Sequence, residues 1–151
     1  MSRAFVKETD DAVEDLPERP VSPAPNFVTA EGLAAIEAEI ARLNHALALA
    51  GEDRAARAII GRDLRYWTAR RGSAQIVPPP SDCEVVRFGC TVTIVRDDGR
   101  RQSFRIVGED EADPERGTLS HVSPLARAVL GKEVGDEVRV GDSIVEIVEI
   151  A

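Results

Sequence analysis

The sequence predicts an α+β protein in which an N-terminal antiparallel helical hairpin precedes a β-rich C-terminal domain. Between residues 29 and 73, apolar side chains recur every three or four residues, which is the period of a helix. After three consecutive prolines at 78–80 the period becomes two, as in a strand. One short helix interrupts the later strands, and strands packed around a single helix form a small α+β domain.

Composition narrows the class of protein. A chain of 151 residues fits one domain, or one small domain with an appendage, and 43% hydrophobic residues suffice for a modest core. The net charge of −8 argues against non-specific binding to nucleic acid, because phosphates select for Lys and Arg. Without an apolar run of membrane-spanning length or a signal-peptide pattern, the chain is expected in the cytoplasm, away from membranes.

The first 26 residues are predicted to be a disordered, acidic tail. They contain Pro17, Pro20, Pro23 and Pro25, carry mixed charge and offer little apolar surface to bury. Residues 27–78 are assigned to the hairpin and residues 79–151 to the C-terminal domain.

The first predicted helix begins near Thr29, which is a good N-cap, and ends at Gly51. Its apolar positions have heptad spacing, which is typical of a coiled coil. These positions are Leu33, Ile36, Ile40, Leu43 and Leu47. The helix is expected to pair within the chain, in a monomer.

The second predicted helix runs to about Ser73, with an apolar face at Ile60, Leu64 and Trp67. Two helices of this length joined by a short turn form an antiparallel hairpin about 30 Å long. Its polar face carries a series of arginines, for which either simple solvation or a binding role is open. These are Arg54, Arg57, Arg62, Arg65, Arg70 and Arg71.

Beyond a stiff polyproline linker at 77–80, residues 91–95 and 102–107 alternate as strands around a turn at 97–100. An acidic loop at 108–117 follows. Further strands are predicted at 118–122, 137–140 and 143–150. Cys83 and Cys90 lack metal-like spacing, and we interpret both as ordinary free thiols.

The most informative stretch is the short helix that begins at residue 124. Ser123 is a natural N-cap, and Pro124 occupies the first helical position, where a missing N–H costs nothing. Gly131 is suited to the left-handed conformation that ends a helix. Capping explains the residue types here, but it does not explain their order.

That order resembles a signature of the GreA/GreB transcription elongation factors, Ser-Pro-x-Ala-Arg-x-x-Leu-Gly-Lys-x-x-Gly-Asp, at residues 123–136. The segments 27–33, 73–77, 86–92 and 104–108 also resemble family segments. The resemblance covers about residues 27–151 and implies an FKBP-like fold for the C-terminal domain.

The resemblance implies a regulator of transcription elongation that is not itself an enzyme. The C-terminal domain would dock at the secondary channel of bacterial RNA polymerase core, and the coiled coil would enter that channel. Contact with DNA or RNA would occur only inside this complex. Acidic residues at the tip would help to hold a Mg²⁺ shared with the polymerase, which stimulates transcript cleavage. No other cofactor and no metal bound by the chain alone is expected.

The signature places the candidate polymerase-binding residues around the start of the short helix. These are His121, Ser123, Pro124, Ala126 and Arg127. The family often has Asp before Ser-Pro, where this chain has Val122, so one polar contact is expected to be absent. His121 is expected to be a half-exposed strand residue with no catalytic role.

At the hairpin tip the chain departs from the family. Glu52 and Asp53 are the only carboxylates there, the arm is short, and Arg54 and Arg57 would compete for the same acids. The sequence therefore predicts a channel-binding regulator without strong stimulation of cleavage. Three alternatives stay open: a cleavage factor that uses Glu52 and Asp53, a regulator like the short-armed Rnk proteins, and an FKBP-like isomerase or chaperone.

Overall fold

The computed structural model describes residues 16–151, and their contacts divide them into two compact units. The first unit contains residues 16–23 and 36–73, and the second contains residues 24–35 and 74–151. The boundary differs from the expected one at 78/79, because the base of the hairpin makes its contacts with the C-terminal domain. The part of the expected tail before residue 16 lies outside the described residues.

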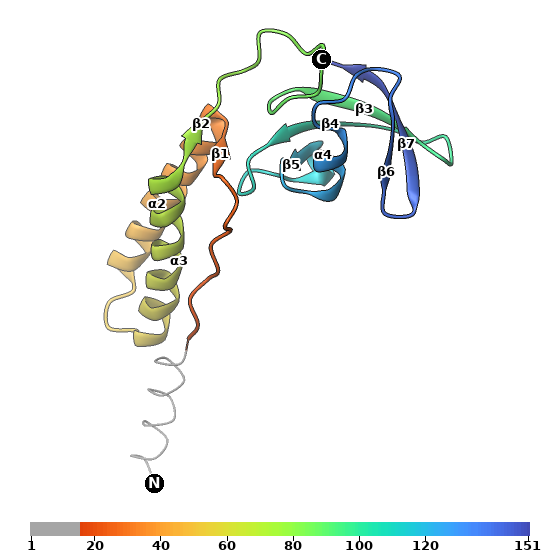
Figure 1. The fold of residues 1–151 in the computed structure, drawn as a ribbon. Helices are drawn as coiled ribbons and strands as arrows, with labels where there is room; N and C mark the ends of the chain where they lie inside the picture. Colours follow the sequence, from red (N-terminus) through yellow and green to blue (C-terminus); the bar gives the residue numbers. More distant parts are fainter. Residues whose placement is uncertain (1–15) are drawn as a thin grey trace. The chain divides into compact units, whose positions relative to one another are not determined.

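The hairpin consists of helix α2 (Ala30–Leu49) and helix α3 (Arg54–Ser73), joined by a turn in which Gly51 has φ +59° (Figure 1). Ile36, Ile40 and Leu43 of the predicted apolar stripe are buried, with 2%, 8% and 3% of their surface exposed. The predicted helical hairpin is confirmed.

Residues 16–23, which belong to the predicted disordered tail, pack along α3. The carboxylate of Glu18 accepts hydrogen bonds from Nε of Arg65 at 2.9 and 3.0 Å. The guanidinium of Arg19 lies 4.0 Å from the ring centroid of Tyr66 and 5.6 Å from that of Trp67. Ion pairs and cation–π contacts therefore order this segment although it has few apolar side chains. The expectation of disorder was wrong for these residues.

Two very short strands close the base of the hairpin. Strand β1 (Phe27–Val28) precedes α2 and pairs in parallel with strand β2 (Gln75–Ile76), which follows α3. The carbonyls of Asn26 and Val28 accept hydrogen bonds from the chain just after α3. A strand of two residues is too short to show the alternating pattern that predicts a strand. The sequence therefore does not predict this pairing, which depends on the two ends of the hairpin lying side by side in the fold.

The carboxylate of Glu111, in the acidic loop, lies at the first turn of α2. It accepts hydrogen bonds from N and Oγ1 of Thr29 and from N of Gly108. A Cβ atom on Gly32 would lie 2.1 Å from Oε2 of Glu111, so only glycine permits this approach. The same Thr29 hydroxyl accepts a bond from N of Gly32, which confirms Thr29 as the N-cap.

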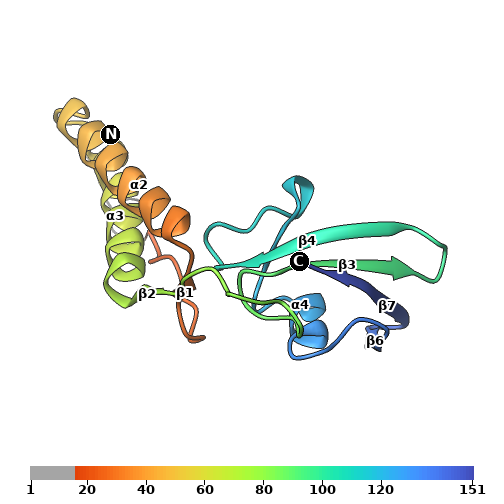
Figure 2. The same cartoon turned by 90° about the horizontal axis from the view of Figure 1, so that it is seen from above.

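The C-terminal domain contains a five-stranded sheet of order β5-β4-β3-β7-β6 (Figure 2). All neighbouring strands are antiparallel except β4 and β5. The strands are β3 (Thr91–Arg96), β4 (Arg101–Val107), β5 (Thr118–Ser120), β6 (Glu137–Val140) and β7 (Ser143–Ile150). A short 3₁₀ helix, η1 (Pro114–Arg116), lies within the acidic loop. The predicted strands are confirmed, except that β5 ends two residues early.

Helix α4 (Pro124–Val129) packs on this sheet. Its buried residues Leu125, Ala126 and Val129 share the core with strand residues such as Ile94 and Ile147, both fully buried. The α+β class, a helical hairpin followed by a β-rich domain, is confirmed.

The cysteines correct another expectation. Cys83 and Cys90 form a disulfide, with their Cα atoms 6.1 Å apart, rather than two free thiols. Their spacing alone did not predict the bond, because seven residues of extended chain would separate them by more than about 20 Å. Hydrogen bonds fold the segment back: N of Gly89 donates to the carbonyl of Ile106, and N of Cys90 donates to that of Arg87.

The Glu18–Arg65 contact predicts a pH-dependent attachment of residues 16–23. The hydrogen bond from Arg65 holds the pKa of Glu18 below its ordinary value of 4.5, so the contribution of this ion pair to attachment is fully present above that pH and is lost as the pH falls through the lowered pKa. The emission of Trp67, the one tryptophan, should change below pH 4.5. Glu18→Gln should remove this transition and Glu37→Gln, on the exposed side of α2, should retain it; a transition unchanged in Glu18→Gln would contradict the assignment.

Candidate functional site

The first candidate site is the corner where β5 leads into α4. Oγ of Ser123 accepts a hydrogen bond from N of Ala126 at 3.3 Å, and Pro124 follows at the first helical position. At the other end, Gly131 has φ +81°, which ends the helix as the sequence predicted. At its start the amide of Ala126 has a partner, and at its end the carbonyls of Ala126 and Val129 accept hydrogen bonds from N of Leu130 and N of Lys132.

The five candidate residues at this corner have different environments. Pro124 and Arg127 are exposed, so both can touch a partner. Ala126 is fully buried in the core, which corrects its assignment as a contact residue: a small side chain is needed there for α4 to approach the sheet. The hydroxyl of Ser123 is engaged in the N-cap, so its role at the corner is to hold the helix start.

His121 lies in the turn after β5 rather than in a strand, because β5 ends at Ser120. Its ring packs against the rings of Phe27 and Phe88, in a tilted arrangement with the first and edge to face with the second. The ring centroid of His121 lies 5.4 Å from that of Phe27 and 5.6 Å from that of Phe88, and the two phenylalanines are 6.2 Å apart. The imidazole thus helps to connect the α4 corner to β1.

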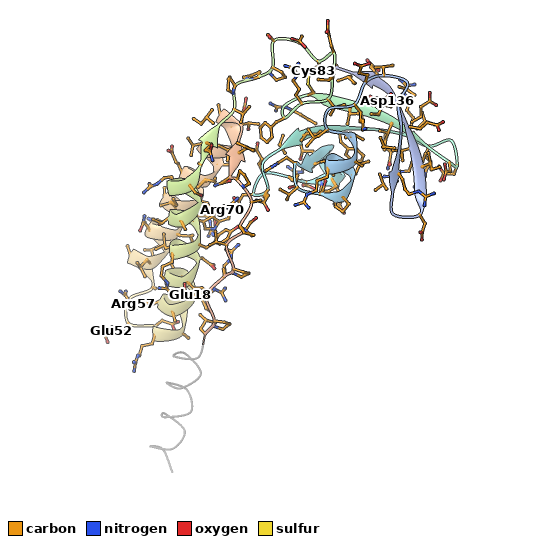
Figure 3. All side chains as sticks on the ribbon, viewed as in Figure 1. Glu18, Glu52, Arg57, Arg70, Cys83 and Asp136 are labelled. Carbon is orange, nitrogen blue, oxygen red and sulfur yellow. A yellow bond between two sulfur atoms is a disulfide. The ribbon has the colours of Figure 1, made fainter. Side chains whose placement is uncertain are left out.

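The second candidate site is the hairpin tip, where Glu52 and Arg57 lie at the turn between the helices (Figure 3). The carboxylate of Asp53 accepts a hydrogen bond from N of Ala56 at 3.1 Å, so Asp53 is the N-cap of α3. A guanidinium nitrogen of Arg57 donates to the carbonyl of Gly51 at 3.1 Å. One of the two tip carboxylates therefore already has a structural role, which follows from the free amides at a helix start.

The arginine series on α3 is partly engaged inside the same unit. Arg65 binds Glu18, and Nε of Arg62 lies 3.3 Å from Oδ1 of Asp63. Arg70 is 1% exposed, so the series is not a continuous solvated face. These contacts reduce the basic surface that the sequence alone indicates.

Within residues 16–151, no group of three or more His, Cys, Asp or Glu side chains is placed to hold a metal ion. In the same part of the chain, no helix is long and apolar enough to cross a membrane.

Sequence reasoning missed two features of the C-terminal unit, the Glu111 cap and the disulfide. Glu111 is one of several acids in the 108–117 loop, and nothing local distinguishes it from its neighbours. Gly32 could have indicated the Glu111 contact. A glycine inside the first turn of a helix lowers helix stability, and its presence there indicates that another group packs closely against the backbone.

In a comparison with known proteins, residues 80–151 match the family described as "Transcription elongation factor, GreA/GreB, C-term". Among curated relatives, GreB of Neisseria meningitidis serogroup B is 43% identical over 81 residues, covering 52% of this chain and 50% of that protein. GreA of Bacillus licheniformis is 45% identical over 76 residues, covering 47% and 48%. The chain thus spans about half the length of the curated relatives it matches.

Solved structures are also similar over a longer stretch. GreA factor homolog 1 of Thermus thermophilus is 18% identical and matches 85% of this chain and 99% of its own, with a TM-score of 0.42. A GreA/GreB factor from Nitrosomonas europaea is 21% identical and matches 83% and 98%, with a TM-score of 0.40.

The tip geometry predicts different effects for its two acids. Replacing Asp53 by Ala should destabilise the hairpin by about 1 kcal/mol, because the amide of Ala56 loses its acceptor. Replacing Glu52 by Ala should change the free energy of unfolding by less than about 0.5 kcal/mol. Urea unfolding followed by Trp67 fluorescence measures both, and equal losses would contradict the capping role.

Proposed function

We propose that the chain is a regulator of the GreA/GreB kind that docks on bacterial RNA polymerase core at the rim of the secondary channel, which is supported by the match of residues 80–151 to the C-terminal domain of those transcription elongation factors. The α4 corner carries this proposal. The family signature falls on the capped helix α4, where Pro124 and Arg127 are exposed. The protein would act as a monomer in the cytoplasm and reach nucleic acid only within the polymerase complex.

The hairpin would serve as a short arm that occupies the channel. Its tip offers one exposed carboxylate without a capping role, Glu52, whereas Asp53 caps α3 and Arg57 folds back onto the turn. A second Mg²⁺ in a two-metal phosphoryl transfer needs several oxygen ligands. The protein would therefore modulate transcription by occupancy, with little stimulation of the polymerase's own cleavage activity.

The docking proposal predicts that Pro124→Arg binds core RNA polymerase at least about ten times more weakly than the wild type, a loss typical of a disrupted interface centre. A long charged side chain at the exposed start of α4 would hold the partner surface away while Ser123 still caps the helix. Gel filtration with core polymerase, or a titration with labelled protein, measures the change.

Pro114→Arg is the matched control, because Pro114 is also an exposed proline at the start of a short helix, η1, in the same domain. It should bind like the wild type. Retained binding by Pro124→Arg, in a protein with an unchanged circular dichroism spectrum, would exclude this corner as the docking surface.

The occupancy proposal predicts no stimulated cleavage when the protein is added to a stalled, backtracked elongation complex. The wild type should nevertheless compete with a genuine cleavage factor for the elongation complex. The concentration of the double variant Glu52→Ala, Asp53→Ala that is needed for half-maximal competition should agree with that of the wild type to within about twofold. Transcript length on a sequencing gel gives both readouts. Cleavage by the wild type that disappears in the double variant would instead identify the tip as catalytic.

A further inference from the structure

The disulfide between Cys83, which is labelled in Figure 3, and Cys90 closes a loop that contacts the chain before and after α4. On the C-terminal side of α4, N of Val86 donates to the carbonyl of Lys132, and N of Gly131 donates to the carbonyl of Val86. Val86 is itself 1% exposed and belongs to the same buried core as α4.

On the N-terminal side, the same loop supplies Phe88, whose ring meets that of His121, two residues before the N-cap. Phe88 also packs against the buried core. One covalently closed loop, residues 83–90, thus supports the start and the end of the helix.

We infer that Cys83 and Cys90 are a reversible redox-modification site that controls how firmly the α4 corner is held, and thereby its affinity for RNA polymerase. The inference rests on the proposed function both for the effect on polymerase affinity and for the redox conditions. A protein that acts on RNA polymerase works in a compartment that keeps thiols reduced, where a disulfide is expected to be transient rather than permanent.

The two sulfurs differ in access. Cys90 is 0% exposed, whereas Cys83 is half-buried, so a small thiolate can reach Cys83 more easily. The reductant would be a small thiol such as glutathione. Its thiolate attacks Sγ of Cys83, the S–S bond breaks, and Cys90 leaves as a thiolate that takes up a proton.

A second glutathione thiolate then attacks the mixed disulfide, releases Cys83 as a thiol and leaves as glutathione disulfide. Two electrons pass to the protein, and the reverse sequence, with glutathione disulfide as oxidant, closes the loop again.

Reduction should loosen the loop, because the closed ring limits the freedom of residues 83–90 in the unfolded and partly opened states. The reduced protein should melt about 5–10 °C below the oxidised one. Amide exchange at Gly131, whose bond goes to Val86 in the loop, should accelerate at least about tenfold, while exchange at Ile94 in β3 should change much less. Affinity for core polymerase should fall severalfold.

The experiment uses the full chain in glutathione buffers of increasing ratio of reduced to oxidised form, with free thiols counted by mass spectrometry. The wild type should pass from no free thiol to two within this series, with melting, Gly131 exchange and polymerase binding changing together. Cys83→Ser should behave as the reduced protein at every ratio, and Ser81→Ala, an exposed position beside the loop, should respond like the wild type.

Two free thiols at every ratio, or none at any ratio, would overturn the inference. So would a redox-dependent melting temperature with unchanged exchange at Gly131, since the loop would then not control α4. If thiol content, melting and exchange respond but neither redox form binds polymerase, the redox site stands and the proposed docking fails.

Discussion

The structure at the base of the hairpin depends on the hydrogen bonds that the carboxylate of Glu111 accepts. This carboxylate joins three donors from two segments, Thr29 at the start of α2 and Gly108 just after β4, that are far apart in the sequence. An acid at a helix start is favoured both by the free amides and by the helix dipole. Gly32 leaves the space that this acid needs, and the acid in turn contacts the threonine that caps α2. Together with the β1–β2 pairing and the contacts of Phe27, this side chain joins residues 24–35 to the C-terminal unit.

The two candidate sites differ in what their residues are free to do. At the α4 corner, capping and burial use Ser123 and Ala126 to place the helix, whereas Pro124 and Arg127 are exposed. At the hairpin tip, capping uses Asp53, one of only two carboxylates, and leaves little with which to hold a metal. At both places the start of a helix needs acceptors for its free amides, and this need engages the hydroxyl of Ser123 at one site and the carboxylate of Asp53 at the other.

Residues 16–23 and residues 83–90 both lack hydrophobic periodicity, and in both segments specific links stabilise the structure. These links are the ion pair of Glu18 with Arg65, the contacts of Arg19 with aromatic rings, and the disulfide between Cys83 and Cys90. Such links join residues 7 to 47 positions apart, and their formation depends on where the folded chain brings them. Composition correctly indicates that these segments lack a core of their own, but it does not report the partners that hold them.

Local pattern in the sequence determined the hairpin, the strands and the capped helix α4, since periodicity, caps and turns act over a few residues. Thus the roles of Thr29, Ser123 and Gly131 follow from their immediate neighbours in the chain, and the order of residues 123–136 indicates the resemblance to GreA/GreB factors. Only the tertiary structure decided that Ala126 is buried, that His121 meets Phe27 and Phe88, that Glu111 caps α2 and that the two cysteines pair. Each of these contacts joins segments that are separated in the sequence and meet only in the folded chain. Local propensities act over a few neighbouring residues, so they do not predict which distant segments come together.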